Sequence, residues 1–147
     1  MFYSEIKIRV RYAETDQMGY CYYGNYAQYF EVGRVEALRT LGVSYKDMEI
    51  QGVLLPVTDY SIKYLKPAFY DENLKIKTTI KKIPGIRIEF EYETYNEKGE
   101  LINTANTKLV FLDKISMKPR VAPDFLMKQL TPFFNEFMKT GKPTNFI

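Results

Sequence analysis

The chain has 147 residues, of which 46% are hydrophobic and 27% are charged; this composition is typical of one folded globular domain and excludes a disordered chain. The formal net charge of +3 is too small to indicate nucleic acid as a partner, although it suits an anionic small molecule. We find no basic N-terminal region followed by an apolar run, and no segment as long as a membrane span. The single cysteine cannot form an internal disulfide, which suits the reducing cytoplasm. These features together predict a cytoplasmic protein without a signal peptide or an integral membrane segment.

The absence of histidine is the most restrictive feature of the composition. It excludes catalysis by Ser-His-Asp or Cys-His groups. Together with the single Cys21 it removes the usual zinc sites, so we expect no metal and no cofactor. The glycines at Gly19, Gly24 and Gly33 do not have the spacing of a phosphate loop or a dinucleotide fingerprint. Acid–base chemistry must therefore use Asp, Glu, Tyr, Lys or backbone groups.

The first part of the chain predicts a strand, a loop and one long helix. Residues 4–11 alternate apolar and polar side chains, as in a half-buried strand, and residues 12–22 are typical of a loop. We expect a helix over about 24–41, which Gly42 ends. Its apolar positions recur at helical spacing and predict a buried face of Tyr26, Tyr29, Phe30, Gly33, Ala37 and Leu41.

The rest of the chain is dominated by alternating segments that are typical of antiparallel strands. We expect strands over 53–66, 74–83, 86–95 and 100–113, a short helical turn over 44–51 and a terminal amphipathic helix over 122–139. With no linker or repeat, residues 1–147 are interpreted as one α+β domain. A five-stranded antiparallel sheet is expected to wrap around the one long helix.

Two details of packing can be predicted from the side chains. Because directly paired residues share a face of the sheet, the hairpin at 84–86 should have a loop longer than two residues, which pairs Lys81 with Glu89 and Lys77 with Glu93. Gly33 is costly in a helix unless the helix lies close to the sheet. The small residues at 103–107 are the expected point of contact.

The segment around Asp16 has the residue types that acyl transfer requires. Asp16 lies in the predicted loop, seven residues before the start of the helix. The free N–H groups of a helix start can stabilise the oxygen of a polarised carbonyl, while a carboxylate can attack the carbonyl carbon or activate water. A thiol, with a pKa near ~8.5, leaves without a general acid, so a thioester is the best-matched substrate. The alternative is that Asp16 only forms a turn or caps the helix.

The same segment resembles the active-site segment of the hydroxybenzoyl-CoA thioesterase family of hot-dog proteins, which includes the acyl-CoA thioesterases associated with the Tol–Pal system. The resemblance is carried by Tyr12-x-Glu14-Thr15-Asp16-x-x-Gly19-x-x-Tyr22-Tyr23-x-Asn25-Tyr26. It continues through Glu31 and Arg34-x-Glu36, Leu55-Pro56-Val57 and Phe111-Leu112-Asp113-Lys114. It covers nearly the whole chain and implies a hot-dog fold and acyl-CoA hydrolysis.

The resemblance also implies roles for individual residues. Asp16 matches the catalytic carboxylate, and Tyr23 matches the position whose backbone N–H binds the thioester carbonyl, with Gly24 beside it in the substrate site. Glu31 matches a helix position that faces the acyl group. The expected assembly is a homodimer with edge-to-edge sheets, or a homotetramer. Basic residues that can meet the CoA nucleotide are Lys82 and Arg87 beside the hairpin, and Lys118 and Arg120 after the last strand.

Three other interpretations remain beside acyl-CoA hydrolysis. The same chemistry can act on an acyl-carrier protein, which is acidic and would also suit a basic patch. A non-catalytic acyl-binding or protein-binding module is the second. A hot-dog hydratase is the third, and the missing histidine argues against it. Cys21 lies near Asp16, but it lacks a base or a strongly cationic neighbour and is expected to be an unreactive buried thiol.

Overall fold

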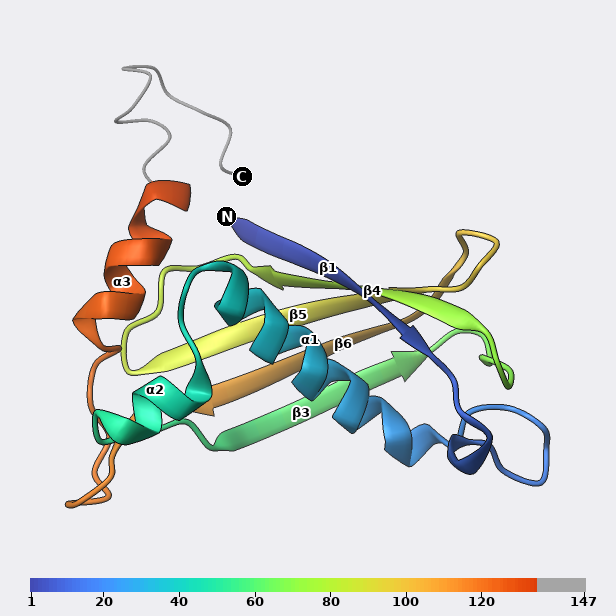
Figure 1. The fold of residues 1–147 in the computed structure, drawn as a ribbon, viewed down its shortest axis with the longest axis horizontal. Helices are drawn as coiled ribbons and strands as arrows, with labels where there is room; N and C mark the ends of the chain where they lie inside the picture. The colour runs from blue at the N-terminus through green and yellow to red at the C-terminus, as the bar shows by residue number, and fades with distance from the viewer. Residues whose placement is uncertain (135–147) are drawn as a thin grey trace.

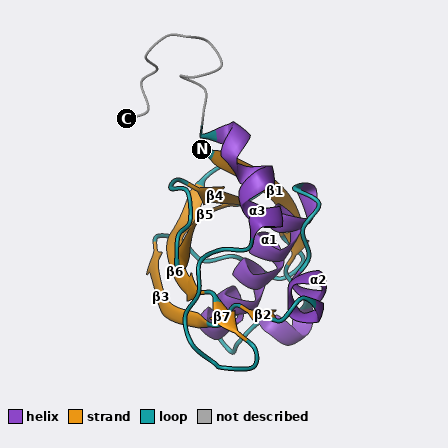
Figure 2. Cartoon of the chain, turned by 90° about the vertical axis from the view of Figure 1, so that its left-hand side faces the viewer, coloured by secondary structure: helices purple, strands orange, loops and turns teal. Residues whose placement is uncertain are grey.

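The computed structural model describes residues 1–134 and contains the α+β arrangement expected from the sequence (Figure 1). Its main sheet has five antiparallel strands in the order β1-β4-β5-β6-β3. Their bounds are β1 (Phe2–Arg9), β3 (Val57–Tyr64), β4 (Asn73–Ile80), β5 (Arg87–Tyr95) and β6 (Leu101–Val110). The end-on view in Figure 2 shows this sheet curving around one side of the long helix α1 (Tyr26–Thr40).

Smaller elements surround this core. Helices α2 (Tyr45–Ile50) and α3 (Asp124–Leu130), the short strand pair β2 (Val53–Leu54) with β7 (Leu112–Asp113), and 3-10 helices Tyr12–Glu14, Tyr23–Asn25 and Thr131–Phe133 complete the described chain. Within residues 1–134, none of the helices has the length and apolar character needed to cross a membrane.

Two predicted strands are interrupted, which corrects their expected bounds. The predicted strand 53–66 divides into β2 and β3 on either side of Pro56, because proline lacks the N–H that a continuous ladder needs. The predicted strand 100–113 divides at the same level into β6, which stays in the main sheet, and β7, which pairs with β2 in a separate two-stranded sheet. The terminal helix is shorter than predicted, and residues 135–139 of that prediction lie outside the described residues.

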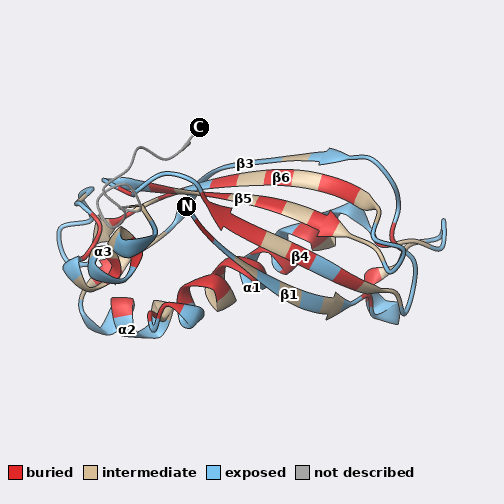
Figure 3. Ribbon diagram, turned by 90° about the horizontal axis from the view of Figure 1, so that it is seen from above, coloured by how far each residue is buried: buried red, intermediate tan, exposed pale blue. Residues whose placement is uncertain are grey.

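The buried face of α1 is confirmed. All six predicted positions are buried, and Leu38 and Arg34 lie buried beside them. Gly42 follows the end of the helix at φ +78°, a left-handed conformation that glycine adopts without strain. Figure 3 shows buried positions alternating along β5 and much of β6, as expected where one face of the sheet packs on α1, whereas the edge strand β3 is almost entirely exposed.

Gly33 does allow a close approach to the sheet, but the predicted partner strand is wrong. A Cβ atom at Gly33 would lie 2.7 Å from Thr78 Oγ1, on β4. The helix packs mainly against β1 and β4. The small residues of β6 face aromatic rings instead: Ala105 pairs with Tyr92, whose ring stacks on Phe30 with centroids 4.5 Å apart. Bulky aromatic side chains thus hold α1 away from β6.

The hairpin register is confirmed where the strands pair. Lys77 lies opposite Glu93, and the loop is longer than two residues, as predicted. The ladder nevertheless ends at Thr79 and Glu91, so the expected pair of Lys81 with Glu89 does not form, and Lys81 Nζ lies 3.1 Å from the Glu91 carboxylate. The connecting segment is drawn toward the residues after β6, because Phe111 N donates to Ile86 O and Ala122 N donates to Gly85 O.

Candidate active site

A cavity of about 380 Å³ lies beside the start of α1. Its walls come from the loop that holds Asp16, from the helix start with Tyr23 and Tyr26, and from the end of β3 at Tyr64 with the residues that follow it. Both predicted catalytic residues, Asp16 and Tyr23, line this cavity. The expected juxtaposition of a loop carboxylate and a helix start is therefore present in the fold.

The Asp16 carboxylate is held by a tight turn. Asp16 N donates to Tyr20 O at 3.0 Å, and Gly19 N donates to Asp16 O at 3.0 Å. The turn places Gly19 at φ +84°, which explains the glycine. Met18 N donates to Asp16 Oδ1 at 2.9 Å, whereas Oδ2 has no hydrogen-bond partner among the described residues. Asp16 is half-buried, so its side chain keeps some access to solvent.

The helix start presents free backbone donors. The 3-10 helix Tyr23–Asn25 leads directly into α1, and Asn25 N donates to Tyr22 O at 3.0 Å. Within residues 1–134, the N–H groups of Tyr23 and Gly24 have no hydrogen-bond partner. Such orphan donors at a helix start carry partial positive charge and can bind a developing oxyanion. A side chain at Gly24 would bring a Cβ to 2.7 Å from the Tyr22 ring, so glycine keeps this start compact.

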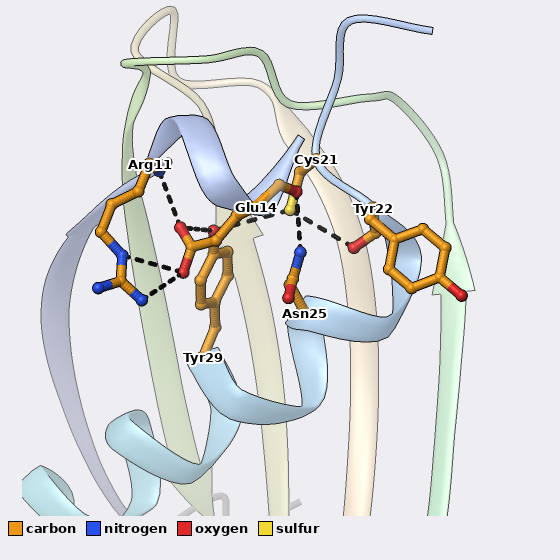
Figure 4. A network of polar contacts seen from close by, with 6 residues as sticks. All are labelled: Arg11, Glu14, Cys21, Tyr22, Asn25 and Tyr29. Carbon is orange, nitrogen blue, oxygen red and sulfur yellow. Dashed lines mark hydrogen bonds and ion pairs between the residues drawn. The ribbon is translucent and has the colours of Figure 1, made fainter. Parts of the chain in front are cut away.

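A buried carboxylate beside the site was missed by the sequence analysis. Glu14 is 6% exposed, and it forms polar contacts with Arg11, Tyr29, Tyr22 and Asn25 (Figure 4). The local signal was its position three residues after Arg11, where a Glu side chain can reach back to the backbone of a helix cap. Its contact with Tyr29 comes from a residue fifteen positions away and cannot be inferred from local spacing.

Cys21 lines the same cavity but is buried, as expected for an unreactive thiol. Burial raises the pKa of its thiol, and the nearby Glu14 and Asp16 carboxylates act in the same direction. A thiolate nucleophile is therefore disfavoured at neutral pH. The described residues also contain no group of three His, Cys, Asp or Glu side chains arranged to hold a metal ion.

The other predicted substrate residues lie elsewhere in the chain. Glu31 is exposed on α1 and does not line the cavity. Lys82 and Arg87 come together on a separate cavity of about 250 Å³. Arg87 begins β5, whereas the Asp16 cavity lies near the opposite end of the sheet, so roughly 25 Å of strand separates them. A single chain does not bring these cations to Asp16. Lys118 and Arg120 follow β7 and are likewise outside the cavity.

A five-stranded antiparallel sheet curved around one long helix, with a cavity at the helix start lined by Asp16 and Tyr23, defines a hot-dog protein. Residues 10–130 match the thioesterase-like superfamily, and the chain belongs to this superfamily.

Relatives support this membership. The chain is 44% identical over 119 residues to a Bacillus subtilis (strain 168) protein named "Putative acyl-CoA thioesterase YneP", covering 81% of this chain and 86% of that protein. It is 30% identical over 122 residues to the acyl-CoA thioester hydrolase YbgC of Escherichia coli O6:H1, covering 83% and 91%. The crystal structure of a DHNA-CoA thioesterase from Staphylococcus aureus superposes with a TM-score of 0.84 at 41% identity, covering 98% of each chain.

Proposed function

We propose that this protein hydrolyses acyl-CoA thioesters to a free carboxylic acid and CoA, as a single-domain cytoplasmic enzyme. One observation carries the proposal: Asp16 and Tyr23 line one cavity, and the N–H groups of Tyr23 and of the adjacent Gly24 have no hydrogen-bond partner within residues 1–134. The names of the thioesterase relatives support the same reaction.

Two routes use these groups. In the first, the Asp16 carboxylate attacks the carbonyl carbon, the C–S bond breaks, CoA leaves as a thiolate, and water hydrolyses the resulting anhydride. In the second, Asp16 takes a proton from water as that water attacks the carbon. In both, the N–H groups of Tyr23 and Gly24 stabilise the negative charge on the carbonyl oxygen. Because a thiol pKa is near ~8.5, neither route needs an imidazole to protonate the leaving group.

We propose that the working form is a homodimer joined through β3; pairing of two such dimers into a tetramer would use other surfaces. Strand β3 is the sheet edge next to β6, and most of its side chains are exposed. Antiparallel pairing of two β3 edges would place the Val57 end of one strand beside the Tyr64 end of the other. This arrangement would carry the partner's Lys82 and the partner's Arg87 toward the Asp16 cavity, where they would bind CoA phosphates. The proposal that Glu31 faces the acyl group rests on the family resemblance alone.

The proposal is tested by thiol release from short, long and aromatic acyl-CoAs and from an acylated acyl-carrier protein. Asp16→Asn removes the charge while keeping the turn, because the amide oxygen still accepts from Met18 N. The matched control is Asp113→Asn, since Asp113 Oδ1 also accepts backbone N–H bonds, from Ile115 and Ser116, at the end of β7 outside the cavity.

We expect Asp16→Asn to lower kcat by about 10²- to 10⁴-fold while Asp113→Asn keeps the wild-type rate. If the wild type releases thiol only from the acylated acyl-carrier protein, the substrate is that thioester and not an acyl-CoA. If the wild type releases thiol from none of them, the protein is a non-catalytic binding module. If Asp16→Asn is as active as Asp113→Asn, the assignment of the catalytic carboxylate is wrong.

A further inference from the structure

We propose that Glu14 is a positioning residue, which fixes the Asp16 carboxylate relative to the N–H donors of Tyr23 and Gly24. The inference rests on the proposed thioesterase function and names a group through which that site is held together. Glu14 does not line the Asp16 cavity, so it would act through the residues around it and not on the substrate.

The side chain of Glu14 has both of its oxygens occupied. Oε1 accepts from Arg11 N at 2.8 Å and from the Tyr29 hydroxyl at 2.7 Å. Oε2 accepts from Arg11 Nε at 3.2 Å and Nη2 at 2.9 Å. Burial opposes ionisation of this carboxyl, but the hydrogen bonds from Arg11 and Tyr29 hold the pKa of Glu14 below its ordinary value. The group is therefore a fully bonded carboxylate at neutral pH, with no free oxygen for general-base chemistry.

The backbone of the same residue binds the helix start. Glu14 O accepts from Tyr22 N at 2.8 Å and from Asn25 Nδ2 at 2.8 Å. Tyr22 directly precedes the oxyanion donor Tyr23, and Asn25 follows Gly24. Asp16 lies only two residues beyond Glu14. The residue thus joins the loop that carries the carboxylate to the turn that carries the donors.

The contact with Tyr29 adds a third point of attachment. Tyr29 is buried on α1, one turn beyond the helix start, so its hydroxyl ties the loop to the rigid part of the helix. Breaking the cluster would let the loop and the helix start move relative to each other. Displacements of about 1 Å in an active site can lower the rate on the order of 10²-fold.

The test compares Glu14→Gln with Glu36→Gln in the full-length protein. Glutamine keeps the size of Glu14, but its Nε2 cannot accept from the Arg11 guanidinium. Glu36 is the matched control, because it also forms an i,i+3 ion pair with an arginine, Arg39, on an exposed part of α1 outside the cavity. We expect Glu14→Gln to lower kcat by about 10- to 100-fold with KM changed less than about threefold, and Glu36→Gln to leave both unchanged.

A double-mutant cycle distinguishes positioning from general destabilisation. If Glu14 acts through Asp16, adding Glu14→Gln to Asp16→Asn lowers the residual rate no further, because the carboxylate that Glu14 positions is already gone. If Glu14→Gln does not fold, Tyr29→Phe takes its place, since it removes one of the four side-chain hydrogen bonds of Glu14. The expected loss of kcat is then about three- to tenfold.

An active wild type with an unchanged kcat in the folded variant would overturn the role of Glu14 and leave the proposed function standing. The role of Glu14 would also be overturned if Glu14→Gln lowered kcat by the same factor in Asp16→Asn as in the wild type, and the proposed function would again stand. A wild type that hydrolyses no thioester would overturn both.

Discussion

Replacing Gly33 with alanine tests how closely α1 approaches β4. Alanine in a helix interior is favoured over glycine by about 1 kcal/mol, so an unobstructed change would stabilise the protein. The new Cβ would lie 2.7 Å from the buried Thr78 Oγ1, and overpacking of this kind costs about 1–3 kcal/mol. We therefore expect a net destabilisation of up to about 2 kcal/mol, measured as the free energy of unfolding in urea.

Two further variants identify the cause of that change. Gly85→Ala is the matched control, because a Cβ there meets nothing within 4 Å and Gly85 does not have a positive φ. It should be neutral or slightly stabilising. Adding Thr78→Ala to Gly33→Ala removes the clashing oxygen, so the double variant should cost less than the two single changes summed. A Gly33→Ala protein as stable as Gly85→Ala would refute the close approach of α1 to β4.

Two other measurements concern the site and its surroundings. Tyr23→Phe should keep kcat within about threefold in the thiol-release assay, because the backbone N–H and not the hydroxyl binds the carbonyl oxygen; a loss approaching that of Asp16→Asn would assign the phenol a chemical role. Burial raises the pKa of Tyr45 to about 12, although the Arg34 guanidinium beside it acts in the opposite direction. The neutral phenol therefore stabilises the fold fully below about pH 10, and this stabilisation is lost as the pH rises toward 12. Unfolding midpoints measured against pH should fall over that range in the wild type and fall less steeply in Tyr45→Phe, whereas equal slopes would contradict the assignment.

Most of the fold could be predicted because its signals are local. Alternation placed the strands, helical spacing placed the buried face of α1, and the pattern of opposed faces gave the Lys77–Glu93 register. The partner of Gly33 could not be predicted in the same way. Small residues on β6 offer space, but that space is filled by Phe30 and Tyr92, and the filling depends on how all the layers pack together.

The same distinction between local signals and long-range contacts applies to the candidate site. Asp16 and the helix start are close in sequence, so their meeting at one cavity could be predicted from one segment. The buried state of Glu14 required its contact with Tyr29, which the fold alone provides. Lys82 and Arg87 are candidates for CoA binding because of their charge beside the hairpin. Charge does not reveal how far they lie from Asp16, and in one chain most of the length of a strand separates them.

The placement of α1 connects stability with chemistry in this protein. The proposed oxyanion donors are backbone groups, so their position depends on where the helix lies and cannot be adjusted by a side-chain rotation. Gly33 sets how closely the middle of the helix approaches β4, and Tyr29 attaches its first turns to Glu14 and thereby to the Asp16 loop. A helix held at both places keeps its first residues, and with them the proposed donors, in a fixed position beside the cavity. A chain without histidine can rely on such fixed groups, because a thioester needs a stabilised oxyanion and an attacking group but no acid for its leaving thiolate.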